Sequence, residues 1–344
     1  MKSYLLAFAA VAAIAAGSGA ASAQAAGNYA PPRTSWGAPE LSGVWTNASL
    51  TSLQRASSAS KVTVTEEEAA QLLARNRYTL ATQDEAGASK LDKESSDKLL
   101  ADKNPARGYN RFWMDPGSDY ARVGNDIRTA WVTSPADGLI PYKPGKRPGF
   151  KVTYDGPEGR PVQERCVSYA RLGPVFGNGM YNNNFQLVQT QSHLMIDAEM
   201  IHEARVIPIF KSAAEAKHGP EALRNFGGDS VAWYEGDTLV VETINVRQDQ
   251  RPHITATGKA IERFTRWKDN EILYQFRVED DSIYTQPWSG EQVLRASSEP
   301  VYEYACHEGN YGMFGILAGA RQLEHDGREH PPEKPIFAGL DADE

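Results

Sequence analysis

The chain has 344 residues, and its 36 basic and 44 acidic side chains give a formal net charge of -8 at pH 7. A mildly acidic chain without a basic stripe argues against nucleic acid and anionic membrane surfaces as partners. The length allows one large domain or two small ones, and 7 Trp with 15 Tyr can fill a core and also line a pocket.

The first 23 residues have the pattern of a secretory signal peptide. Lys2 gives a positive start, residues 4–16 form an almost unbroken apolar run, and residues 21–23 are a small-x-small cleavage site. The alternative is a membrane anchor, which needs about 20 apolar residues and so more than this run offers. We therefore expect a periplasmic or secreted protein with no membrane span.

The chain has two cysteines, Cys166 and Cys306. In an oxidising compartment an isolated pair most simply forms a disulfide. Such a bridge would close a loop of about 140 residues, for which chain entropy assigns roughly 4 to 5 kcal/mol as an upper figure. The alternative is two free buried thiols. A catalytic cysteine is disfavoured, because an exported thiol near a possible partner tends to be oxidised.

The N-terminal half combines one helix with long connecting segments. Residues 24–37 form a polar, flexible leader, and residues 41–45 form a first strand. Thr65 and Glu68 make a capping box for a helix within residues 63–80. Residues 82–103 are polar and predict a surface excursion.

Residues 104–184 are dense in Gly, Pro, Asp and Asn, which predicts long ordered loops with a few short strands. Loops of this length in a compact domain usually have a function. We therefore interpret residues 63–184 as a helical and loop insertion that covers a site.

From residue 185 the pattern becomes β. Residues 194–208 alternate over fifteen positions, which places His202 in an apolar row and places Arg205 on the opposite face with two glutamates, as an ion-pair row in solvent. Two hairpins are predicted over residues 231–246 and 261–278. Further elements are predicted at residues 185–189 (strand), 292–296 (strand), 301–306 (strand) and 311–323 (helix).

Consecutive antiparallel strands without β-helix-β alternation exclude a doubly wound nucleotide fold. The sequence predicts a mainly β chain: an antiparallel meander that closes into a lipocalin-like barrel or a strongly curved sheet. We place a single β-rich domain at residues 38–325, followed by a disordered tail at residues 326–344.

Segments in two parts of the chain resemble segments of known protein families. Gly43-Val44-Trp45 resembles the opening strand of lipocalin-like barrels. Residues 233–243 (WYEGDTLVVET) and 302–311 (YEYACHEGNY), with shorter segments between residues 180 and 321, resemble a family of secreted proteobacterial and acidobacterial proteins that is mostly uncharacterised. The resemblance implies a secreted protein and no particular activity.

The familiar catalytic and cofactor signatures are absent from the sequence: there is no HExxH, no GxSxG, no phosphate loop and no GxGxxG. Glu199-Met200-Ile201-His202-Glu203 only partly matches a metal motif, because on a strand His202 would point away from both glutamates. We therefore expect neither a metal nor a cofactor.

His202 is the first candidate for a catalytic role. An imidazole among apolar neighbours inside a barrel would stay neutral and could act as a general base or acid. The alternative is a buried histidine that only bonds a core partner. His307 and Glu308, next to Cys306, are candidates for a second acid or base, and otherwise form an exposed strand end.

Five further residues are candidates for binding a ligand. They are amide donors, a cation and aromatic walls: Asn183, Asn184, Arg205, Tyr284 and Trp288. The function predicted from this set is an exported lyase, hydratase or isomerase acting on a small apolar or aromatic molecule. The alternatives are a lipocalin-like periplasmic carrier that uses the same cavity without chemistry, and an envelope protein whose loops bind a partner.

Overall fold

The computed structural model describes residues 29–80, 114–146, 156–169, 172–247 and 253–328. The predicted signal peptide, the polar segment 82–103 and most of the predicted tail lie outside these residues. No helix within the described ranges is both long and apolar enough to cross a membrane. The boundaries of a single domain over residues 38–325 stay a prediction.

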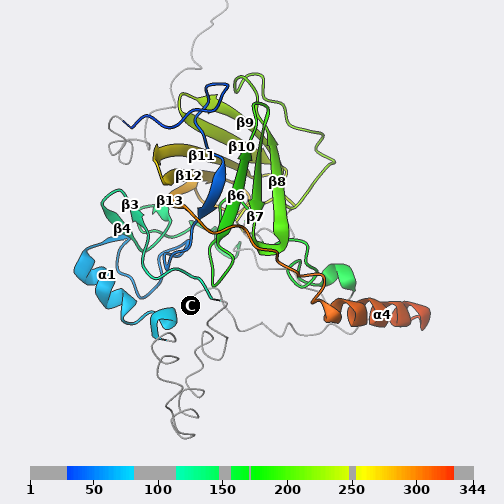
Figure 1. Ribbon diagram of the computed structural model, residues 1–344. Coiled ribbons are helices and arrows are strands. Elements are labelled where there is room, and N and C mark those ends of the chain that lie inside the picture. Colours follow the sequence, from blue (N-terminus) through cyan, green and yellow to red (C-terminus); the bar gives the residue numbers. More distant parts are fainter. Residues whose placement is uncertain (1–28, 81–113, 147–155, 170–171, 248–252, 329–344) are drawn as a thin grey trace, which may run out of the picture.

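The fold is dominated by one antiparallel sheet of ten strands that curls around itself (Figure 1). Its strands are β1 (Gly43–Thr46), β5 (Val132–Ser134), β6 (Asn184–Gln189), β7 (His193–Ala198), β8 (Glu203–Pro208), β9 (Asp229–Glu235), β10 (Thr238–Ile244), β11 (Lys259–Lys268), β12 (Glu271–Glu279) and β13 (Trp288–Ala296). Their order is β8-β7-β6-β1-β13-β12-β11-β10-β9, and β5 pairs with β13. The two edge strands of the sheet, β8 and β9, come together where the N–H of Phe210, just after β8, donates to the carbonyl of Ala232 in β9 at 2.7 Å. The predicted mainly β fold with a nearly closed antiparallel barrel is confirmed.

Smaller elements lie outside the barrel. They are the three-stranded sheet of β2 (Thr63–Val64), β3 (Arg122–Val123) and β4 (Asp126–Arg128), the helices α1 (Glu66–Leu73) and α4 (Tyr311–His325), and the 3-10 turns η3 (Pro157–Gly159) and η4 (Met200–His202). The capping box of Thr65 and Glu68 is present at the start of α1. The predicted helix is interrupted: α1 ends at Leu73, and the chain is helical again at residues 77–80, where the side chain of Asn76 accepts the N–H of Tyr78 at 2.9 Å.

The two ends of the barrel differ. Short hairpin turns close one end, at residues 190–192, 236–237 and 269–270. At the opposite end, which we call the loop end, the strands run into longer connections, whose described parts are residues 47–62, 135–146, 172–183, 253–258 and 280–287. The loop end therefore gathers several connections long enough to enclose a site.

The strand predicted over residues 194–208 is wrong, because the chain folds there into a hairpin. β7 and β8 pair antiparallel with Ala198 opposite Glu203, and η4 forms the turn between them. Ile201 and His202 adopt positive φ angles of 65° and 50° in this turn. The turn reverses the alternation, so that Arg205 points into the barrel and His202 lies exposed outside it.

Aromatic side chains fill the barrel interior. A loop at residues 172–179, which we call the plug loop, inserts Phe176 between Phe185 and Tyr274, with ring centroids 4.7 and 4.6 Å away. All three side chains are buried. Stacked aromatic pairs add to the free energy of burying the rings themselves. The plug loop is therefore part of the hydrophobic core.

A buried ion pair lies beside the plug loop. The guanidinium of Arg205 contacts both carboxylate oxygens of Glu262, and its remaining N–H groups reach Ser230, Thr243 and the carbonyl of Leu172. All five donors of the guanidinium thus have partners. Tyr274 donates to the same carboxylate at 2.8 Å, and burial, followed by the charge of Glu262, raises the pKa of Tyr274 well above its usual value.

The ion pair also fixes the path of the plug loop. Gly173 has a φ of +92°, and a Cβ atom there would lie 2.6 Å from Nη1 of Arg205. Only glycine combines that backbone conformation with so close an approach to the guanidinium. Because Leu172 accepts from Arg205 at 3.3 Å, the loop enters the barrel at the ion pair itself.

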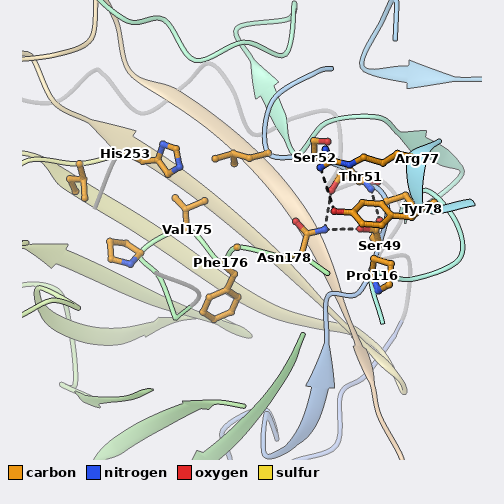
Figure 2. Close-up of a pocket in the computed structure, with 16 residues that line it drawn as sticks. Ser49, Thr51, Ser52, Arg77, Tyr78, Pro116, Val175, Phe176, Asn178 and His253 are labelled. Carbon is orange, nitrogen blue, oxygen red and sulfur yellow. Dashed lines mark hydrogen bonds between the residues drawn. The ribbon is translucent and has the colours of Figure 1, made fainter. Parts of the chain in front are cut away.

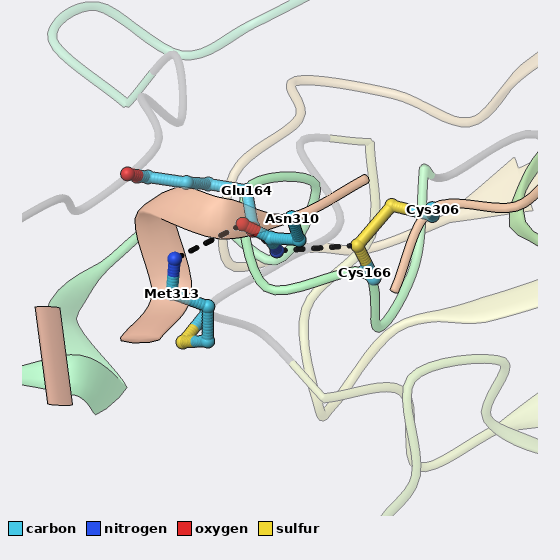
Figure 3. The surroundings of a disulfide bond; sticks show 5 residues. All are labelled: Glu164, Cys166, Cys306, Asn310 and Met313. Carbon is cyan, nitrogen blue, oxygen red and sulfur yellow. Dashed lines mark hydrogen bonds between the residues drawn. A yellow bond between two sulfur atoms is a disulfide. The ribbon is translucent and has the colours of Figure 1, made fainter. Parts of the chain in front are cut away.

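The predicted disulfide between Cys166 and Cys306 is confirmed, with the two Cα atoms 5.8 Å apart (Figure 3). Asn310 lies beside it, caps α4 by accepting the N–H of Met313 at 3.1 Å, and donates to the carbonyl of Glu164 at 2.6 Å. The strand predicted at residues 301–306 is absent: this segment pairs with no strand and is held by the disulfide and by hydrogen bonds such as that of the Tyr304 N–H to His202.

We predict that Arg205→Met lowers the free energy of unfolding by about 3 to 5 kcal/mol, since it leaves the Glu262 carboxylate buried and unpaired. The measurement is urea denaturation. Arg263→Met is the control, because Arg263 lies next to Glu262 in β11 but pairs with Glu235 at the surface. That variant should lose less than about 1 kcal/mol. Equal losses in the two variants would contradict the role given to the buried pair.

Candidate functional site

A cavity of about 340 Å³ lies at the loop end of the barrel (Figure 2). Sixteen described residues from five stretches of chain line it: Ser49, Leu50, Thr51, Ser52, Leu53, Arg77, Tyr78, Pro116, Pro174, Val175, Phe176, Gly177, Asn178, Gly179, His253 and Ile254. The volume lies within the range of small-molecule sites, about 300 to 1,000 Å³.

The plug loop forms one wall of this cavity, with residues 174–179 facing it. The same loop is fixed from behind by buried amides: Gln292 donates to the carbonyl of Phe176 at 2.7 Å, and Asn47 donates to that of Gly177 at 3.2 Å. Val175 adopts a positive φ of 68°, which is costly for a β-branched residue and persists only where the surroundings impose it. The wall is thus rigid before any ligand binds.

The second wall is the segment at residues 49–53, which follows β1. Asn178 ties it to the plug loop by donating to the carbonyls of Ser49 and Thr51 at 2.8 and 3.0 Å. Trp131 in turn donates to the side-chain oxygen of Asn178 at 3.4 Å. One partly buried set of hydrogen bonds therefore sets the spacing between the two walls.

The cavity has a polar side and an apolar side. Figure 2 shows Arg77, Tyr78, Ser52 and Asn178 grouped together, with His253 and Val175 away from them on the other side. Arg77 lies 5.0 Å above the ring of Tyr78, a cation-π contact that orients the guanidinium. A ligand with one polar end and an apolar body matches this division.

His253 is the histidine at the cavity, and an aromatic cluster supports it. Its Nδ1 lies 3.4 Å from the hydroxyl of Tyr142, and its carbonyl accepts from Tyr284 at 2.5 Å. Trp288 packs edge-on against the imidazole with ring centroids 6.2 Å apart. Burial is the main cause that raises the pKa of Tyr284 above its usual value, so this phenol stays protonated.

The prediction that His202 points into the barrel is wrong. Its side chain is exposed, and Nε2 accepts the backbone N–H of Tyr304 at 2.8 Å, which attaches the C-terminal segment to the outside of the barrel. His307 and Glu308 are exposed on that same segment. None of the three lines the cavity, and their predicted catalytic roles gain no support from their positions.

The predicted ligand-binding residues are dispersed. The predicted position of Arg205 on a solvent face is wrong. Its side chain lies inside the barrel and pairs with Glu262. Asn184 is partly buried and donates to the buried carboxylate of Glu199 at 2.9 Å, away from the cavity. Tyr284 and Trp288 are buried, and they lie behind His253 rather than in the cavity wall.

Asn183 supports the cavity from behind. Its side chain accepts the N–H of Gly179 at 2.8 Å and donates to the carbonyls of Gly179 and Asp115 at 2.9 and 2.7 Å. Gly179 lines the cavity, and so does Pro116, the residue that follows Asp115. Asn183 therefore acts on the shape of the cavity and does not face a ligand.

The sequence does not single out Arg77, Asn178 or His253: Arg77 lies in a helical stretch, the other two lie in connections, and none belongs to a motif. The length of the strand predicted over residues 194–208 could have indicated the hairpin that turns His202 outward. A fifteen-residue strand would be about 50 Å long, well beyond the strands of compact barrels. The turn at residues 199–202 was hidden because it contains no Gly, Pro, Asn or Asp.

Among the described residues, no three His, Cys, Asp or Glu side chains are placed to hold a metal ion. No protein-family model matches the chain, and no curated protein matches it either. The resemblance to secreted proteobacterial and acidobacterial proteins therefore stays a prediction, and the function has to be argued from the cavity.

Proposed function

We propose that this protein binds a small molecule with an apolar body and one polar end, in the cavity at the loop end of the barrel. The observation that carries the proposal is the plug loop, whose inner side is anchored in the core and whose outer side forms a cavity wall. A wall that is rigid in the free protein lowers the entropic cost of binding.

The lining is consistent with such a ligand. Leu53, Val175, Phe176 and Ile254 offer apolar surface, and a few polar groups stand on one side of the cavity. Sites for small molecules usually combine a mainly apolar wall with a small number of fixed polar groups. This proposal places the ligand among the end loops, whereas a lipocalin-type carrier would hold it in the barrel interior, which aromatic rings fill here.

We predict that Ser52→Trp abolishes binding of apolar aromatic compounds while leaving the fold intact. Ser52 lines the cavity and is exposed, so an indole at this position fills the space without displacing core side chains. Binding is measured by isothermal titration calorimetry over a compound panel, and stability by thermal unfolding.

The control for this prediction is Ser57→Trp, which adds the same indole to an exposed position of the same connection that does not line the cavity. This variant should bind like the parent protein. Unchanged binding by Ser52→Trp, or no binding of any compound by the parent, would overturn the proposed site.

A second candidate function is acid-base catalysis on the bound molecule, and it is favoured by the position of His253. An imidazole at a cavity wall can take up or give a proton near neutral pH. The hydroxyl of Tyr142, 3.4 Å from Nδ1, can orient the ring at the cavity wall. This keeps a lyase or isomerase activity as a proposal, with His253 in the place first considered for His202.

For this candidate we predict that His253→Gln retains ligand binding within about two-fold but lowers turnover by about 100-fold or more, the usual contribution of a general acid or base. His193→Gln is the control, because His193 is exposed at the opposite, hairpin end of the barrel. Turnover is followed by product analysis. If the parent protein binds compounds but converts none of them, the catalytic proposal is wrong and only the binding function remains.

A further inference from the structure

A segment of chain covers part of the outer face of the barrel. Val231 and Trp233 of β9 and Val240 of β10 form a buried apolar cluster on this face, separate from the barrel core. Residues 211–219, which follow β8 and which we call the strap, cover this cluster, and Ala216 packs against it. The strap thus keeps apolar side chains of the sheet out of water.

The strap is attached at one place between two fixed points. Before the strap, Phe210 is hydrogen-bonded to β9, and after it Asn245 donates to the carbonyl of Glu221 at 2.8 Å. Between these points the strap is attached through the side chain of His218 and through the N–H of Gly219, which donates to a carboxylate of β9 at 2.6 Å. Closure of the strap therefore depends on this attachment.

The imidazole of His218 lies between two carboxylates from different strands, an arrangement that we call the latch. Nε2 is hydrogen-bonded to Oε1 of Glu242 in β10 at 3.2 Å. The buried Nδ1 lies 3.2 Å from Oδ2 of Asp229 in β9, the same oxygen that accepts from the strap backbone. The other oxygen of Glu242 is 3.5 Å from Nζ of Lys259 in β11, whereas Lys217 on the strap is exposed.

This geometry favours the protonated imidazole. A neutral ring has one N–H, so one of its two nitrogens presents a lone pair to a carboxylate, whereas imidazolium has an N–H on both. Lys259 neutralises part of the charge of Glu242, and the His218 side chain is 18% exposed, so the gain is that of partly exposed ion pairs. Protonation therefore strengthens both contacts of the latch by a modest amount.

We propose that the strap is a pH-sensitive cover, closed while His218 is protonated and loosened as the pH rises through the range in which histidines ordinarily lose their proton, about 6 to 7. The closed strap favours the bound proton, so closure gains stability at acidic pH and loses it at alkaline pH. Opening uncovers Trp233 and the apolar cluster around it. This device is independent of the ligand proposed for the cavity.

The test is amide hydrogen exchange of residues 211–219 in the whole protein at about pH 5.5 and about pH 8, on either side of the ordinary histidine range, with each rate corrected for its intrinsic pH dependence. Protection of the strap should be about five-fold lower at the higher pH, the scale of a partly exposed ion pair. The strand β11 is the internal reference: its amides should be far better protected than the strap in both conditions, with no such change.

Variants assign the pH dependence to the latch. His218→Gln has no titrating ring and should show the lower protection at both pH values. Glu242→Gln offers an amide N–H that a neutral imidazole can accept, so the difference between the two pH values should shrink to less than about two-fold. His193→Gln is the matched control, because that exposed ring contacts the hydroxyl of Ser192 at the hairpin end, and it should keep the full pH dependence.

Thermal unfolding confirms that each variant is folded, and the comparison of the parent protein at two pH values stands without any variant. Equal protection of the parent strap in the two conditions, or better protection at the higher pH, would overturn the proposal. So would a pH dependence that persists in His218→Gln. Loss of the pH dependence in His218→Gln and Glu242→Gln, with His193→Gln unchanged, supports it.

Discussion

The structure depends on the buried ion pair between Arg205 and Glu262. Removing two charges from water is costly, and the cost is offset here because every N–H of the guanidinium has a partner. The pair joins β8 to β11 across the interior of the barrel and bonds the first carbonyl of the plug loop. A loop fixed in this way can fill the barrel on one side and form a binding wall on the other.

This arrangement explains why the cavity lies among the end loops. Phe176 and the other interior rings leave the barrel lumen packed, so the proposed ligand would lie where the plug loop emerges. Asn178, Asn183 and Gln292 then transmit the rigidity of the core to the wall through hydrogen bonds to the backbone. The site is therefore built on the barrel, although none of its lining residues belongs to a strand of it.

The sequence predicted the fold better than the site. Alternation identified the hairpins at residues 231–246 and 261–278, because alternation is a local signal. The isolated cysteine pair, together with the expected oxidising compartment, predicted the disulfide. The predicted direction of His202 is wrong because this residue lies in a hidden turn, which also reverses the parity of the strand that follows. The partnership of Arg205 with Glu262 spans 57 positions and leaves no local pattern to read. The cavity likewise joins five separate stretches of chain.

Amide hydrogen exchange of the plug loop, residues 172–179, tests the central claim most directly. If the loop is anchored in the core through Arg205 and Gln292, its amides should exchange as slowly as those of β6 and β11, which open only in global unfolding. The exposed connection at residues 211–224 gives the rate expected of a surface loop. Plug-loop amides that exchange as fast as this connection would contradict the account.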